Sequence, residues 1–178
     1  MIKKIILFCV LLSFVAVANA QSSSDDFKVD INAGYANPTK GYGVNPGVSL
    51  VIEPHSFLTK NLALGVRFEG DLIGYTPQYD DEVFSYFGSS CLTLDYYFSK
   101  SQFRPFVGAG GGLFTRHYVF SDDNYSDDSL YGGYGTIKLG LFYRAGFEIG
   151  PLRLSGSYNI VGYNFSYSAF TIGYTFRE

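Results

Sequence analysis

Cysteine is scarce in this sequence, and the longest apolar run is confined to its first twenty residues. We expect Cys9 to be removed with that segment, so Cys91 would be the only remaining thiol and no intramolecular disulfide could form. After Ala20 no apolar run is long enough for a membrane helix, although 47% of the residues are hydrophobic. The apolar residues must therefore be dispersed in alternation with polar ones, which is typical of β-strands.

The first twenty residues have the three parts of a secretory signal peptide. Lys3 and Lys4 give a positive start, residues 5–17 are apolar, and residues 18–20 (Ala-Asn-Ala) form a small-residue cleavage site. The apolar stretch is shorter than the about 20 residues that a spanning helix needs. Gln21 follows the cleavage site where a lipoprotein would have a cysteine, so no lipid anchor is expected. We predict that residues 1–20 are cleaved on export.

Acidic residues outnumber basic ones in the part that remains. Removing two lysines from the 13 basic residues and none of the 16 acidic ones leaves a formal charge of −5 (11 − 16). This negative balance argues against nucleic acid as a partner. The remaining 158 residues (178 − 20) suit a single domain over residues 21–178.

Eight segments alternate apolar and polar side chains and are predicted to be strands. They cover residues 27–36, 48–53, 62–71, 92–98, 103–114, 137–148, 152–160 and 170–176. Pro54 is expected to close the second strand, which leaves His55 in the turn that follows. Glycines blur the phase of the fifth strand, where we assign Val107 and Leu113 to the apolar face. The fold class is therefore all-β, and the pattern predicts an eight-stranded antiparallel up-and-down barrel.

Alternation alone does not say which face of the barrel points inward, because a soluble lipocalin-like barrel shows the same alternation with its apolar face inside. The lumen of an eight-stranded barrel is just wide enough to be filled by side chains, and the many large apolar residues would not fit there. We therefore expect a transmembrane barrel whose apolar face meets lipid and whose lumen holds paired charges. The predicted lumen charges are Lys28, Asp30, Arg67, Glu69, Asp71, Asp95, Lys138, Arg144, Glu148 and Arg153.

The connections between strands also alternate. Those at 54–61, 99–102 and 150–151 are short, whereas those at 37–46, 76–83 and 121–135 are longer, and the last two of these are acidic. An even number of strands places both termini on one side, which is periplasmic in an outer-membrane barrel. The longer loops are therefore expected to face outward.

Two segments resemble the small outer-membrane β-barrel proteins, the OmpX-like proteins and OmpA-type transmembrane domains, including members from Bacteroidota. They are RPFVGAGGGLF at 104–114 and FTIGYTF at 170–176. The resemblance implies export to the outer membrane and contact with its lipid and lipopolysaccharide as a monomer. It also implies an assembly signal read by the barrel-assembly machinery, although Arg177 and Glu178 follow where such signals usually end. The residues of the predicted signal are Phe170, Ile172, Gly173, Tyr174 and Phe176.

Candidate chemistry is sparse. His117 lies near Ser121 and Asp122, which could suit lipid-modifying catalysis, but no triad or nucleophile-elbow motif accompanies them. Carboxylates at 122, 123, 127 and 128 could bind calcium, yet they lack the spacing and central glycine of an EF-hand. GAGGG at 108–112 lacks the helix and Lys-Ser/Thr of a phosphate-binding loop. We therefore expect no catalytic residue, no metal and no cofactor.

The leading hypothesis is a non-enzymatic outer-membrane protein with a filled polar lumen that contributes to envelope integrity or surface interaction through its outward loops. A narrow porin-like channel is the alternative, because small residues on the polar face could leave water-filled gaps. A lipid-modifying outer-membrane enzyme is a lesser one.

Overall fold

The computed structural model describes residues 27–39, 44–75, 83–119, 136–162 and 166–177. The predicted signal peptide lies outside the described residues, as do most of the predicted outward loops. None of the described residues forms a helix that is long and apolar enough to cross a membrane.

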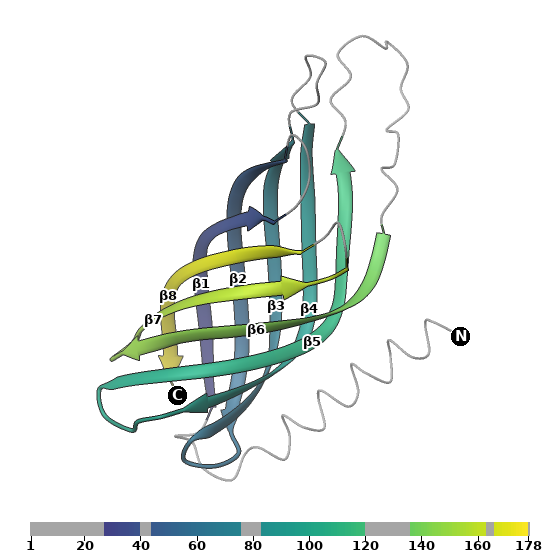
Figure 1. Ribbon diagram of the computed structural model, residues 1–178. Coiled ribbons are helices and arrows are strands. Elements are labelled where there is room, and N and C mark those ends of the chain that lie inside the picture. Colours follow the sequence, from purple (N-terminus) through teal and green to yellow (C-terminus); the bar gives the residue numbers. More distant parts are fainter. Residues whose placement is uncertain (1–26, 40–43, 76–82, 120–135, 163–165, 178) are drawn as a thin grey trace, which may run out of the picture.

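Eight antiparallel strands form one closed barrel, in which each strand pairs with the next and β8 pairs with β1 (Figure 1). The predicted fold class is thus confirmed. The strands are β1 (Phe27–Pro38), β2 (Val44–Phe57), β3 (Leu62–Tyr75), β4 (Val83–Tyr97), β5 (Phe103–Val119), β6 (Thr136–Ile149), β7 (Leu152–Ile160) and β8 (Tyr167–Arg177).

Side chains alternate between a polar lumen and an apolar outer wall. On β6, Leu139 and Tyr143 are 82% and 56% exposed, whereas Arg144 is only 4% exposed. Arg67 and Arg153 are the largest of the fully buried side chains, which is the reverse of a water-soluble protein. On β5 the outward positions include Val107 and Leu113, as predicted. Large apolar side chains therefore cover the wall, as contact with lipid requires.

The prediction that Pro54 ends the second strand is wrong. β2 continues to Phe57, and Pro54 pairs with Val29 of β1. Proline removes one N–H from the ladder, but the neighbouring pairs hold the strand together. His55 consequently lies in the strand rather than in a turn, and its side chain is buried in the lumen at 3% exposure.

Three phenylalanines of β5 and β6 point into the lumen, and the ring of each packs over a glycine of the neighbouring strand. Phe106 pairs with Gly146 and Phe142 with Gly110, whereas Phe114 pairs with Lys138 and its ring lies over Gly140. A Cβ atom added at Gly110 would lie 2.5 Å from the Phe142 ring. Glycine is therefore required beneath these rings, because any side chain would occupy the volume that the ring fills.

Both described ends of the chain lie at the same end of the barrel, since Lys28 pairs with Arg177. The short connections 58–61, 98–102 and 150–151 lie at this end as well (Figure 1). In outer-membrane barrels the end with both termini and short turns is periplasmic.

Candidate functional site in the barrel lumen

Arg144 of β6 is the centre of one buried ion cluster. Its two Nη atoms each lie 2.5 Å from a carboxylate oxygen of Glu53 on β2. Its Nε and Nη2 atoms also donate to the two oxygens of Asp95 on β4, at 2.8 and 2.7 Å. All three of its guanidinium nitrogen atoms thus meet carboxylates from two other strands, in the two-pronged geometry that makes arginine pairs strong. This cluster links β2, β4 and β6 across the lumen.

Arg153 of β7 extends this cluster toward the periplasmic end. Its Nη2 donates to Asp95 at 2.7 Å, while its Nη1 lies 2.9 Å from Glu148 and 3.1 Å from Asp30. The Tyr97 hydroxyl accepts a hydrogen bond from the same Nη1 at 2.7 Å and donates one to Glu148 at 2.6 Å. Three carboxylates from three strands therefore share one guanidinium.

Neutral hydroxyls add further hydrogen bonds to these carboxylates. Thr93 donates to Glu53 at 2.7 Å, and Thr175 donates to Asp30 at 2.6 Å. The Phe106 ring packs against the Arg153 guanidinium, with 4.0 Å between the guanidinium carbon and the ring centroid. Buried charges need such partners, because an unpaired buried charge is costly.

A second and more apolar layer fills the outer half of the lumen. Cys91 packs there in a cluster of buried apolar residues that includes Phe87, Phe114 and Phe142. The Arg67 guanidinium lies over the Phe142 ring at 4.9 Å and contacts Glu69 at 3.0 Å. The ion clusters and this aromatic layer thus lie one above the other inside the barrel.

Nine of the ten predicted lumen charges are buried. Lys138 differs, because it is only half-buried near the start of β6, about 20 Å along the strand from Arg144. Sequence reasoning missed Glu53, His55 and Tyr97. Glu53 lies within the predicted strand at 48–53, on the face opposite Leu50 and Ile52, but it was left out of the predicted lumen charges. His55 was missed because the strand was ended at Pro54, and continuing the alternation past Pro54 would have placed it on the inward face.

His55 lies beside two carboxylates, an arrangement that invites comparison with a metal site. One ligand atom each from His55, Asp30 and Glu148 lie within 4.8 Å of one another, and His55 Nδ1 is 3.3 Å from Asp30. Lys28, Arg104 and Arg153 already contact Glu148 at 3.5, 3.6 and 2.9 Å. Because cations already surround the carboxylates, a metal ion would be repelled, and the arrangement suits ion pairing.

Two other candidate sites were predicted, the surroundings of His117 and the assembly signal. His117 pairs with Tyr86 through the backbone of β5, but its side chain, Ser121 and the acidic residues at 122–128 lie outside the described part. The predicted assembly signal forms β8, which closes the barrel against β1. Its apolar members are about half exposed or more on the outer wall, and Gly173 pairs with Asn32 on the inward side. The predicted signal residues so placed are Phe170, Ile172, Tyr174 and Phe176.

Solved structures of small outer-membrane barrels resemble this one over most of its length. Neisserial surface protein A is 19% identical, with a TM-score of 0.65 over 85% of this chain and 97% of that chain. The outer-membrane protein OprG from Pseudomonas aeruginosa is 13% identical, with a TM-score of 0.54 over 89% of this chain and 99% of that one.

The attachment invasion locus protein Ail of Yersinia pestis, solved with the heparin analogue sucrose octasulfate, is 13% identical. Its TM-score is 0.53 over 85% of this chain and 99% of that chain. The chain has the fold of the small outer-membrane β-barrels. The apolar outer wall fits contact with lipid, and the likeness confirms the predicted resemblance at the level of the fold. No protein-family model and no curated protein matches the chain.

Proposed function

We propose that the protein is a monomeric, non-enzymatic outer-membrane barrel whose closed lumen makes it a rigid support for loops at the cell surface. In this role it contributes to envelope integrity or to surface interaction. The observation that supports the proposal best is the cross-strand ion cluster of Arg144 and Arg153, stacked beneath a layer of aromatic rings.

A closed lumen follows from how these side chains are held. Arg144 and Arg153 are at most 4% exposed, and each is fixed by carboxylates from at least two other strands. Moving either guanidinium aside to admit ions or solutes would leave buried carboxylates without partners, at a cost of several kcal/mol. The same contacts connect strands on opposite sides of the barrel, which stiffens the wall that carries the loops.

Conductance in planar bilayers distinguishes a closed support from the porin-like alternative. The mature protein, with insertion verified by heat-modifiable gel migration, is expected to leave the bilayer silent. A second sample carries Glu53→Ala with Arg144→Ala, a neutral exchange that empties the centre of the lumen. Steady channel openings from the wild-type protein would contradict the proposal and favour a narrow pore.

The control for that variant changes the adjacent outward residues on the same two strands, Ile52→Ala with Tyr143→Ala. Both side chains face the outer wall and are about half exposed. The control is expected to remain as silent as the wild type. If only the Glu53/Arg144 variant conducts, the ion cluster is what closes the lumen.

Surface presentation is supported by the placement of the long connections. Residues 76–82 and 120–135 join strands at the end opposite the termini and include many acidic residues. Ail, a structural relative with a TM-score of 0.53, is named for attachment and invasion, which supports a surface role for such a scaffold. A peptide tag inserted after Ser126 is expected to bind antibody on intact cells. Detection only after the outer membrane is broken would contradict the outward orientation.

Absence of catalysis is part of the proposal. His55 is buried among charged groups, and within the described ranges no serine, threonine or cysteine is hydrogen-bonded to it. Incubation of the reconstituted protein with phospholipid and lipopolysaccharide is expected to release no fatty acid and to transfer no acyl chain. Turnover that is lost on His117→Ala would contradict this and support the lipid-modifying alternative. During biogenesis we propose the barrel-assembly machinery as the partner that recognises β8.

A further inference from the structure

The described part of the periplasmic end of the barrel is basic at its surface, although the whole chain has a formal charge of −3. Among the described residues, every exposed charged side chain at this end is a cation: Lys60, Lys100 and Arg177. Lys60 lies in the 58–61 turn and Lys100 in the 98–102 turn. Arg177 Nη2 donates to the carbonyl of Gly150 at 2.8 Å, which ties its guanidinium to the third short turn. We call these three residues the basic rim.

Just inside this end, several cations meet at one carboxylate, although Arg153 also contacts Asp30 and Asp95. Lys28, Arg104 and Arg153 all contact the single carboxylate of Glu148. Lys28 Nζ and Arg104 Cζ lie 4.7 and 5.0 Å from the centroid of the Phe57 ring. Neither Lys28 Nζ nor Arg104 Nε has a hydrogen-bond acceptor within the described part.

Each cation of the rim follows closely after an exposed apolar side chain. Lys60 comes two residues after Leu58, which is 57% exposed, and Lys100 two residues after Phe98, which is 60% exposed. Arg177 directly follows Phe176, which is 50% exposed. Aromatic residues at the edge of a membrane barrel lie at the level of the lipid headgroups. The next residues outward are thus at the level of the phosphates, which long basic side chains reach readily.

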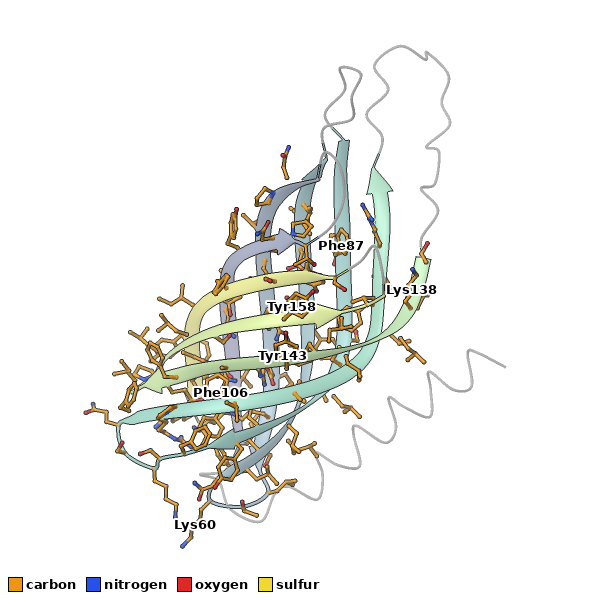
Figure 2. The ribbon with its side chains drawn as sticks, viewed as in Figure 1. Lys60, Phe87, Phe106, Lys138, Tyr143 and Tyr158 are labelled. Atoms are coloured by element: carbon orange, nitrogen blue, oxygen red, sulfur yellow. The ribbon has the colours of Figure 1, made fainter. Side chains whose placement is uncertain are left out.

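We propose that the basic rim binds the phosphate groups of anionic glycerophospholipids in the periplasmic leaflet of the outer membrane. Lys60 and Lys100 lie in two separate turns, and Arg177 ends β8 with its guanidinium held at the third turn. This spacing around the barrel suits several headgroups arranged in a plane. Figure 2 shows Lys60 at the end of the barrel away from Phe87 and Lys138. Since each cation near an anionic surface contributes about 1 kcal/mol, each should favour an anionic neighbour by about fivefold.

The test uses the mature protein in nanodiscs that contain phosphatidylethanolamine and phosphatidylglycerol in equal amounts, with native mass spectrometry of the lipids that remain bound. The wild type is expected to retain phosphatidylglycerol several-fold more than phosphatidylethanolamine. A triple glutamine variant should abolish that preference; it carries Lys60→Gln, Lys100→Gln and Arg177→Gln. High salt during reconstitution should weaken it, because exposed charges are screened.

Two controls separate the rim from general effects of charge and folding. Lys138→Gln makes the same chemical change away from the rim and should keep the preference. A second triple variant keeps the positive charge of the rim: Lys60→Arg, Lys100→Arg and Arg177→Lys. It should also keep the preference for phosphatidylglycerol, and its folding is checked by heat-modifiable migration. Equal retention of the two lipids by the wild type would overturn the proposal and leave an acidic periplasmic protein as the ligand of the rim. An undiminished preference in the folded triple glutamine variant would overturn it too.

Discussion

Arg153 Nη2 lies 2.7 Å from the Asp95 carboxylate, across the lumen from β7 to β4 and 58 residues apart in sequence. Because Asp95 also accepts hydrogen bonds from Arg144, this contact joins the two arginine clusters into one. The charges around Arg144 and Arg153 therefore form a single connected group, whereas Arg67 and Glu69 form a separate pair in the outer half of the lumen.

Replacing Arg153 by alanine should strongly destabilise the barrel. The change leaves Glu148 and Asp30 without their nearest guanidinium, and removing one partner of a buried ion pair costs about 3–5 kcal/mol. Equilibrium unfolding in urea, with the protein in lipid vesicles, measures the loss. Lys100→Ala removes an exposed cation and should change stability by no more than about 0.5 kcal/mol. Similar losses in both variants would show that the central cluster is not a main source of stability.

Gly110→Ala should destabilise the barrel by about 1–3 kcal/mol, because it overfills the space that the Phe142 ring occupies. The new Cβ would lie 2.5 Å from the ring and closer still to the backbone carbonyl of Leu92, so no simple side-chain movement relieves it. Ala109→Val is the matched control, since Ala109 is the next residue and faces outward. If the unfolding curves of Gly110→Ala and Ala109→Val coincide, the tight packing of Gly110 against Phe142 is refuted.

Contact between the outer wall and lipid can be tested by placing an arginine at two depths in the membrane. Leu92 is 63% exposed and pairs with Gly111 near the middle of β5, whereas Leu58 is 57% exposed in a periplasmic turn. Arginine on the lipid face costs about 2–4 kcal/mol at the bilayer midplane and about 0–1 kcal/mol near the interface. Leu92→Arg should therefore lower the free energy of unfolding in vesicles much more than Leu58→Arg. Equal and small effects would indicate that this wall does not contact lipid.

The strands and their inward and outward faces could be predicted from sequence because the period of two is strong on most of them. The prediction failed at Pro54, where a local rule for ending strands was overridden by pairing with β1. Inward phenylalanines such as Phe106 and Phe142 could not be anticipated. Their space depends on which glycine lies across the strand pair, and that register is set by closure of the whole barrel.

The lumen charges were easier to predict as a set than as contacts. A buried face that carries both signs of charge indicates pairing, but alternation does not say which carboxylate meets which arginine. Arg144 and Glu53 are 91 residues apart and lie on strands that are not neighbours in the barrel. Only the closed geometry brings them together.

Cys91 tests the central claim of a closed lumen most directly. It is the only cysteine after residue 20, and it lies 2% exposed among the aromatic side chains inside the barrel. The measurement is the rate at which a small charged methanethiosulfonate modifies the mature protein in vesicles, compared with the same protein in urea. The closed lumen predicts that Cys91 reacts only after unfolding. Modification of the folded protein at the rate of the unfolded one would contradict it and would mean that water and solutes pass through the barrel.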